Sequence, residues 1–473
     1  MFGALLWAAA VATPQPHSLR LGFNVGYLSD GAKYANALST LRADGLLQHL
    51  RFMGAWMHPN GSATSRTSAW TSSLLSEYLG ELGDGASATI TLSDFPFDVQ
   101  PDFLTDASKY LTAWVGQPAT ALLADSLSYT NRAPPTRGAW ILRSEDPQAA
   151  ALTAYGREVA SLRQLLATTS DLAGRVDVEV GNEPNALKYF WGASAEWAPI
   201  ADTALGALDS SSRLLQSPVG GRRRALSPRV LCCAFTTSLS AQRGVSGGTS
   251  SWGRYAQNES RRASLSFHFY RQCTNGANVN RSTYANASAF FGAAALNGSV
   301  LTEWGLFTYN SNTTEDAINS PRLTLELARL LRWCHTFRIA EVDAHCLMDD
   351  PSKRGHNCYF DRLGNPKAAY HALLRVARIV RGGYVATFDR RFNLTTITSA
   401  GAGSSITNTT RLVAAAGGYD GEGVASAPFE LNATRRDRVI AASNFSYNGV
   451  TLPAGQWLVV ESAAAVDIRD DIV

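Results

Sequence analysis

The chain has 473 residues, which is the length of two ordinary domains or of one large barrel with additions. Hydrophobic residues make up 45% and charged residues 17%, a composition that supports a large core and excludes a disordered or fibrous protein. The formal net charge is only +3, without the clustered basic excess of a nucleic-acid-binding protein, and no uncharged apolar stretch reaches the roughly 18 residues that span a membrane.

The first residues are typical of a short secretory leader. Residues 1–12 are apolar and end in Ala10-Val11-Ala12, the small-x-small pattern that signal peptidase requires. The segment lacks a basic region, so a buried first turn is the alternative. We expect residues 1–18 to form a leader, and the protein to be secreted or to reside in the secretory pathway or a lysosome-like lumen.

Strands and helices alternate over the next part of the chain. Short apolar runs predict eight strands, and segments with helical periodicity lie between them. The predicted strands cover residues 19–24, 49–55, 88–93, 176–180, 229–235, 264–270, 300–302 and 339–344. The predicted helices cover residues 35–47, 73–82, 150–168, 321–338 and 366–379. This alternation predicts an α/β fold, a (β/α)8 TIM barrel over residues 19–383.

The character of the sequence changes after Gly383. Strand-like segments are separated by turns rich in Gly, Asn and Ser, and helical periodicity is missing. The predicted strands here cover residues 393–398, 411–415, 438–443 and 456–460. We therefore expect residues 384–473 to form a small C-terminal all-β, sandwich-like domain.

Cysteines and glycosylation sequons agree with an oxidising compartment. Cys346 and Cys358 flank a polar loop and are the pair that closes most easily. Cys232 and Cys233 lie within a predicted strand, which would point them to opposite faces, so at least one is expected to be ordinary core. The cysteines show no zinc-ligand spacing, and we predict neither a metal nor a cofactor. Candidate glycosylation sites are Asn60, Asn258, Asn280, Asn286, Asn297, Asn312, Asn393, Asn408, Asn432 and Asn444.

The most informative segment is the strand that ends in Gly181-Asn182-Glu183-Pro184. In a (β/α)8 barrel the carboxyl end of each strand faces the active site, so Asn182 and Glu183 place an amide and a carboxyl group there. Glu303 ends another predicted strand and is followed by Trp304 and Gly305. Two carboxyl groups at strand ends are what a glycosidase requires.

A third strand contributes His268 and Tyr270, which alternate onto one face. Asn-Glu-Pro on the fourth strand, His-x-Tyr on the sixth and Thr-Glu-Trp-Gly on the seventh resemble the clan A glycoside hydrolases, retaining enzymes built on (β/α)8 barrels. The string Gly181–Asn185 is most similar to family 79, the heparanase and β-glucuronidase group, which also has a C-terminal β-domain. Thr302–Gly305 is closer to family 39, the xylosidase and iduronidase group. The order of elements matches over residues 19–382, and identity of motifs is confined to these three stretches.

The resemblance implies that Glu183 is the acid/base and Glu303 the nucleophile of a double displacement that retains configuration. It implies that Asn182 binds the sugar 2-hydroxyl and that Tyr270 orients the nucleophile. The other candidate substrate-binding residues are His268, Arg51 at the second strand, and Trp304, which is either a sugar platform or barrel packing. The end of the eighth strand lacks the Trp often found there in the clan. The expected partner is an oligosaccharide, polysaccharide or other glycoside.

Alternatives remain at this stage. A β-xylosidase or β-glucosidase of the same clan fits the motifs, as does a carbohydrate-binding pseudoglycosidase without turnover. Tyr189, Phe190 and Trp191 are either an aromatic subsite wall or core. The Gly-x-Ser-x-Gly string at residues 244–248 is a loop rather than the strand-to-helix elbow of a serine hydrolase, and the basic run at residues 222–224 is interpreted as a solvated loop.

Overall fold

The computed structural model divides into two compact units. The barrel unit comprises residues 20–323 and 337–374, and the β unit comprises residues 1–19, 324–336 and 375–473. Within these units the structure describes residues 15–27, 31–46, 48–53, 75–77, 79–80, 86–92, 146–169, 172, 174–185, 194–209, 229–237, 249–273, 284–308, 313–349, 358–389, 394–400, 411–416, 427–428, 438–442, 451–452 and 457–462.

The barrel unit contains a closed barrel of eight parallel strands in sequential order. The strands are β1 (Arg20–Tyr27), β2 (His49–Met53), β3 (Ser87–Leu92), β4 (Val176–Val180), β5 (Val230–Thr236), β6 (Ser264–Cys273), β7 (Val300–Thr308) and β8 (Glu341–Ala344). The ring closes where Arg20 of β1 pairs with Glu341 of β8. Helices connect the strands, as a parallel sheet requires, so the predicted (β/α)8 barrel is confirmed.

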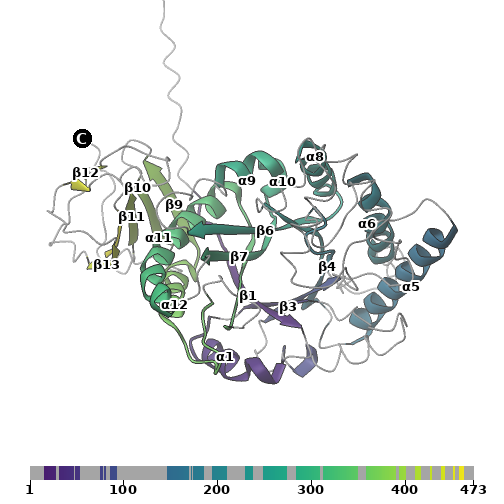
Figure 1. The fold of residues 1–473 in the computed structure, drawn as a ribbon, viewed down its shortest axis with the longest axis horizontal. Coiled ribbons are helices and arrows are strands. Elements are labelled where there is room, and N and C mark those ends of the chain that lie inside the picture. The colour runs from purple at the N-terminus through teal and green to yellow at the C-terminus, as the bar shows by residue number, and fades with distance from the viewer. Residues whose placement is uncertain are drawn as a thin grey trace, which may run out of the picture. The chain divides into compact units, whose positions relative to one another are not determined.

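Helices lie along the outside of the ring of strands (Figure 1). Those of the barrel unit are α1 (Gly31–Ala43), α5 (Asp146–Thr168), α6 (Ser194–Asp209), α8 (Thr249–Glu259), α9 (Tyr284–Phe291) and α10 (Ala293–Leu296). Two further helices, α11 (Thr313–Phe337) and α12 (Ala368–Val380), contribute residues to both units. No helix of the described ranges is long and apolar enough to cross a membrane.

Charged side chains point into the interior of the barrel. On β2, His49 and Arg51 alternate with Leu50 and Phe52, so the polar side chains share one face of the strand. Arg51 contacts Glu179 of β4 and Glu303 of β7. Because β2 borders neither strand, these contacts must cross the interior. Most TIM barrels fill this space with branched apolar side chains. Here an arginine and two glutamates form ion pairs in it.

The β unit contains a five-stranded antiparallel sheet with strand order β13-β15-β11-β10-β9, and a separate two-stranded pair, β12-β14. Its strands are β9 (Tyr384–Asp389), β10 (Leu394–Ser399), β11 (Arg411–Ala416), β12 (Ala427–Pro428), β13 (Arg438–Ala442), β14 (Thr451–Leu452) and β15 (Trp457–Ser462). The predicted C-terminal all-β region is therefore present. His17 joins this unit by exchanging backbone hydrogen bonds with Tyr384, at 2.8 and 3.0 Å; residues 1–14 of the expected leader lie outside the described residues.

One helix differs from its prediction. A Pro at the first turn favoured a start at Pro321, but α11 begins at Thr313 and contains Pro321 in its interior. The additional residues begin with Thr-Thr-Glu-Asp, types that favour a helix N-terminus through capping and through their negative charge. The helix therefore begins at these residues and not at Pro321.

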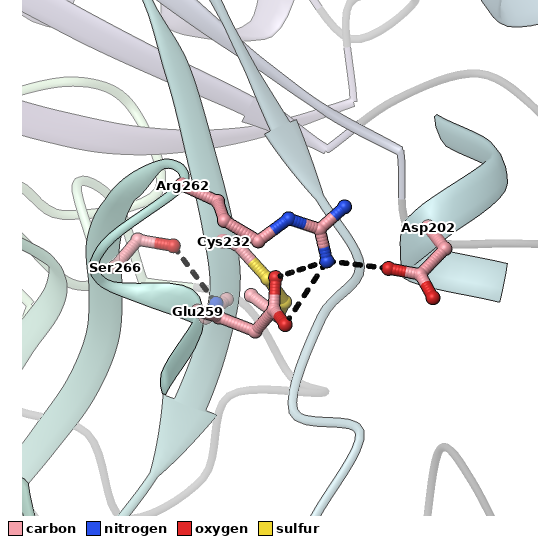
Figure 2. Close-up of a disulfide and its surroundings, with 7 residues drawn as sticks. Asp202, Cys232, Glu259, Arg262 and Ser266 are labelled. Carbon is pink, nitrogen blue, oxygen red and sulfur yellow. Dashed lines mark hydrogen bonds and ion pairs between the residues drawn. A yellow bond between two sulfur atoms is a disulfide. The ribbon is translucent and has the colours of Figure 1, made fainter. Parts of the chain in front are cut away.

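The cysteines of β5 also differ from their prediction. Cys232 and Cys233 form a disulfide with each other and are both buried. The alternation expected of a regular strand fails because β5 is irregular: its register with β6 shifts between Cys232 and Phe235, and Ala234 has a φ of 53°. Figure 2 shows this disulfide near Ser266, whose Oγ accepts a hydrogen bond of 2.8 Å from the backbone N–H of Ala234.

Several sequence predictions can be located. Three sequons, Asn258, Asn286 and Asn297, are exposed on the barrel unit, which is where glycosylation requires them. The remaining sequons lie outside the described residues, as do the aromatic run 189–191, the basic run 222–224 and the Gly-x-Ser-x-Gly string. Cys346 and Cys358 are bonded to each other, as predicted.

Removal of the Cys346–Cys358 disulfide should destabilise the barrel unit. The bond joins residues 12 positions apart, and constraining an unfolded loop of that length contributes about 3 kcal/mol. We expect the Cys346→Ser/Cys358→Ser double variant to lose about that free energy of unfolding in urea denaturation. Cys334→Ala, which removes a buried free thiol, controls for the loss of cysteine itself. An unchanged urea midpoint in the double variant would contradict the prediction.

Candidate active site

The turn after β4 is held in place by its backbone. Gly181 has a φ of 84°, and a Cβ there would lie 2.6 Å from the Trp197 ring, so only glycine fits. Glu183 also adopts a left-handed conformation, with a φ of 49°, and its N–H donates to the carbonyl of Ala234 at 3.0 Å. Such a conformation costs a non-glycine residue about 1–3 kcal/mol and is concentrated at functional sites.

A side-chain amide fixes the same turn to β5. Asn185 is buried, and its Nδ2 donates to the carbonyl of Thr236 at 2.8 Å. The backbone N–H of Thr236 donates in return to Asn185 Oδ1 at 2.9 Å. The pair of bonds mimics one step of a β-ladder beyond the end of the strand. The Glu183 side chain therefore projects from a turn tied to its neighbouring strand.

The second carboxyl group, Glu303 of β7, is nearly buried and has three donors. Tyr270 of β6 donates its hydroxyl to Oε2. Arg51 donates Nη1 to Oε1 at 2.6 Å, and Asn24 of β1 donates Nδ2 to the same oxygen at 3.1 Å. Donors from three strands fix both oxygens of the Glu303 carboxyl group.

His268 links the two carboxyl groups. Its Nδ1 lies 2.9 Å from Glu183 Oε1 and 3.5 Å from Glu303 Oε2. One oxygen of Glu183, one oxygen of Glu303 and this nitrogen all lie within 4.8 Å of one another. The carboxyl groups of retaining glycosidases are about 5–5.5 Å apart, and those of inverting enzymes about 6.5–9.5 Å. One oxygen of each group within 4.8 Å of the other agrees with the shorter of these separations.

Arg51 binds three of the side chains that form the site. It is completely buried, and besides Glu303 it binds Glu179 Oε2 through Nε at 2.7 Å and Asn182 Oδ1 through Nη2 at 3.0 Å. Thr91 adds a hydrogen bond of 2.7 Å to Glu179 Oε2. The guanidinium thus positions the nearly buried carboxyl group and the amide that precedes Glu183.

The charges around Glu303 determine its ionisation. Burial alone would raise the pKa of Glu303, but His268, His345, Arg51 and the Tyr270 hydroxyl together hold that pKa well below its usual range. Burial likewise disfavours the charged form of Arg51, yet Glu179 and Glu303 raise its pKa. Glu303 is therefore an ionised carboxylate at neutral pH.

Most of the site residues expected from the sequence come together. Glu183, Glu303, Asn182, His268, Tyr270 and Arg51 are joined by the contacts above. Trp304 is different: it is 1% exposed and follows Glu303 in β7, so the alternation of a strand turns it to the opposite side of the barrel wall. Its placement favours barrel packing, the second of its two interpretations.

Three further residues belong to the site and were not found from the sequence. Asn24 and Glu179 contact Glu303 and Arg51, respectively. His345 follows β8, lies with Nδ1 3.9 Å from Glu303 Oε2 and packs edge-on against Tyr270. The sequence held one signal for Glu179: Asp and Glu alternate with Val in β4. A charged residue on the inner face of a barrel strand needs a buried partner.

Two groups in the described part of the chain bring together side chains that could hold a cation. One is Glu183, His268 and Glu303, and the other is His49, Glu341 and Asp343. The first group coincides with the paired carboxyl groups. The second lies nearer the amino ends of the strands, where His49 begins β2 and Glu341 begins β8.

Comparison with known proteins shows the fold. No family model matches the sequence, and no curated protein is significantly similar to it. A family 30, subfamily 8 xylanase from Clostridium acetobutylicum aligns with 96% of this chain and 98% of its own, with TM-score 0.50 and 12% identity. A family 39 glycoside hydrolase from Bacteroides cellulosilyticus aligns with 94% of this chain and 81% of its own, with TM-score 0.54 and 11% identity. A glucosidase from Croceicoccus marinus aligns with 96% and 98%, with TM-score 0.54 and 10% identity. At these identities, the similarity shows a shared fold.

The low pKa of Glu303 predicts an acid-sensitive contribution to stability. Because this pKa is depressed in the folded state, the contribution is present above the usual value of 4.5 and is lost as the pH falls below it. Urea denaturation from pH 7 to pH 3 should show that the wild type loses stability relative to Glu303→Gln below about pH 4.5. Parallel pH dependence of the two proteins would show that the Glu303 pKa is not depressed.

Proposed function

We propose that the protein is a retaining glycoside hydrolase that cleaves O-glycosidic bonds by double displacement. The observation that carries the proposal is the pair of carboxyl groups in the turn after β4 and within β7, with one oxygen of each within 4.8 Å of the other and His268 between them. The glycoside hydrolase folds of the neighbouring structures support the same conclusion.

In the first step Glu303 is the nucleophile. Its low pKa keeps it ionised, and Tyr270, Arg51 and Asn24 hold its oxygens in place. A carboxylate oxygen attacks the anomeric carbon, the bond from that carbon to the leaving oxygen breaks, and a glycosyl-enzyme ester forms. The ion pair with Arg51 keeps the free carboxylate ready and weakens as its charge is lost to the ester bond.

Glu183 is the acid and then the base. It donates its proton to the leaving oxygen in the first step. In the second step it removes a proton from water, the water oxygen attacks the anomeric carbon, and the bond to Glu303 breaks with net retention. His268, 2.9 Å from Glu183 Oε1, orients this carboxyl group through both protonation states.

Asn182 is positioned to bind the sugar. Its Oδ1 accepts from Arg51 at 3.0 Å, which orients the amide. The Nδ2 group is then the one we assign to the sugar 2-hydroxyl, where hydrogen bonds strengthen in the transition state. His345 follows β8, where the clan often has Trp, and its Nδ1 lies 3.9 Å from Glu303 Oε2.

For the substrate we propose a β-linked glycoside, with a β-glucuronide ahead of a β-xyloside or β-glucoside. The support for a glucuronide is the resemblance of Gly181–Asn185 to the heparanase and β-glucuronidase group, and the cationic surroundings of Glu303. The support for neutral sugars is that Arg51 already binds three protein acceptors, whereas a uronate needs donors of its own.

We also propose that the protein acts in the secretory pathway or outside the cell. The bond between Cys346 and Cys358 and the exposure of Asn258, Asn286 and Asn297 support this location.

Substitutions of the two carboxyl groups should have different consequences. Glu303→Gln should lower kcat by about 10⁴-fold or more while sugar binding persists, because the nucleophile is lost but the pocket keeps its shape. Glu183→Ala should lose activity mainly on poor leaving groups, and azide should partly restore it. Kinetics with an activated aryl glycoside and with an unactivated one measure both effects. Near-normal rates in both variants would refute the assignment.

A panel of 4-nitrophenyl glycosides identifies the sugar. We expect release of the chromophore from the β-glucuronide, with the β-xyloside and β-glucoside at least about 10-fold slower, a ratio equal to about 1.4 kcal/mol of discrimination. Faster release from the β-xyloside or β-glucoside than from the β-glucuronide would contradict the proposed substrate but not the proposed mechanism. Binding of several glycosides without release from any would indicate a carbohydrate-binding pseudoglycosidase instead.

A further inference from the structure

A second cluster of ionisable side chains lies inside the barrel, at the opposite ends of the strands from the paired carboxyl groups. His49 is the first residue of β2, and Glu341 and Asp343 belong to β8. Gly22 of β1 pairs with His49 on one side and with Asp343 on the other. A Cβ at Gly22 would collide with Asp343 Oδ1 and lie 2.9 Å from His49 Cβ. The missing side chain of Gly22 makes room for the cluster.

The three side chains point toward one another. His49 Nε2 lies 3.0 Å from Glu341 Oε1, and one oxygen of Asp343 lies within 4.8 Å of both atoms. All three residues are completely buried. Their donor atoms, one imidazole nitrogen from β2 and two carboxylate oxygens from β8, lie within 4.8 Å of one another.

The carboxyl group of Asp343 distinguishes this cluster from a structural ion pair between His49 and Glu341. Neither of its carboxyl oxygens has a hydrogen-bond partner among the residues that the structure describes. An isolated buried carboxylate is strongly disfavoured unless it is paired or coordinates a cation. The two buried oxygens of Asp343 without hydrogen-bond partners therefore suit a ligand for a cation.

The surroundings of His49 suit a metal ligand. Its Nδ1 lies 2.7 Å from Ser87 Oγ, and its Nε2 lies 3.0 Å from both Thr89 Oγ1 and Glu341 Oε1. Metal-binding histidines usually have such a partner on the other ring nitrogen.

Glu341 is oriented by its other oxygen. Arg20 and Arg229 both bind Oε2, the latter at 2.9 Å, so Oε1 is the atom turned toward His49. Among the described residues of the barrel interior below Glu183, carboxyl groups outnumber guanidinium groups by five to three. They are Asp177, Glu179, Glu303, Glu341 and Asp343, against Arg20, Arg51 and Arg229.

We propose that His49, Glu341 and Asp343 form a binding site for one divalent transition-metal cation of the Zn²⁺ or Mn²⁺ type, which stabilises the barrel. One imidazole with two carboxylates suits these ions, whereas Mg²⁺ and Ca²⁺ prefer sites made of oxygen alone. The site revises the expectation of no metal. None of its three ligands is a residue that we propose for glycosidase catalysis.

Metal analysis of the full-length, untagged protein tests the site. After chelator treatment and dialysis, the wild type incubated with Zn²⁺ or Mn²⁺ should retain about one ion per chain by mass spectrometry. Its Tm should rise by about 4 °C at 100 times the dissociation constant, because the ion binds only the folded state. Mg²⁺ should produce neither effect. Wild-type protein that retains neither Zn²⁺ nor Mn²⁺ would overturn the proposal, with Asp343 then holding a proton.

Matched variants locate the ion. Asp343→Asn and His49→Gln should each lower occupancy at least about 10-fold and abolish the metal-dependent rise in Tm. Asp177→Asn alters an acid at the same end of the barrel that pairs with Arg229, and it should bind as the wild type does. Glu303→Gln tests the paired carboxyl groups as the binding site instead. Loss of the ion in Glu303→Gln with retention in Asp343→Asn and His49→Gln would overturn the proposal.

Discussion

The arrangement of the candidate active site depends on the burial of one guanidinium group. Arg51 is sequestered from water inside the barrel and binds Glu179, Glu303 and Asn182 at once. Removing one member of a buried ionic network costs about 3–5 kcal/mol, because the remaining charges lose their partner in a medium that solvates them poorly. The network is therefore costly to alter and holds its members in one geometry. That rigidity matters for a nucleophile, since misplacement by about 1 Å can reduce a rate 100-fold.

The β4–β5 edge supplies the complementary constraint on Glu183. Its left-handed backbone is held by the carbonyl of Ala234, which is itself left-handed and whose N–H donates to Ser266 Oγ. The irregular stretch of β5 that contains Cys232 and Cys233 thus presents the carbonyl that Glu183 requires. Glu303 is held by side chains, whereas Glu183 is held by backbone and by His268. The difference suits their proposed roles, because an acid/base must change protonation state without losing its position, while a nucleophile must keep its charge.

The sequence predicts those features that are written locally. The eight barrel strands were found because each is a short apolar run, and Glu183 and Glu303 were found because each ends such a run beside turn-forming residues. Asn24, Glu179 and His345 escaped because their significance comes from partners on other strands: Glu179 acquires its role only when β2 brings Arg51 beneath it. The same holds for Cys232 and Cys233, where an irregular register replaced the alternation that a regular strand predicts. The cluster of His49, Glu341 and Asp343 joins residues almost 300 positions apart through the pairing of β1 with β2 and β8, so no spacing rule could have found it.

The polar interior also explains why the two ends of the barrel differ chemically. At the carboxyl ends of the strands, Glu303 has several donors and a depressed pKa, so its charge is stabilised by the protein itself. At the other end, Asp343 is buried beside the like charge of Glu341, and its pKa is raised. A barrel filled with branched apolar residues would avoid this second carboxyl group. Its presence destabilises the fold unless a bound cation or proton neutralises it, and the cation alone would also engage the neutral imidazole of His49. Metal binding would then be coupled to the folding of the barrel through β2 and β8, which carry the three ligands.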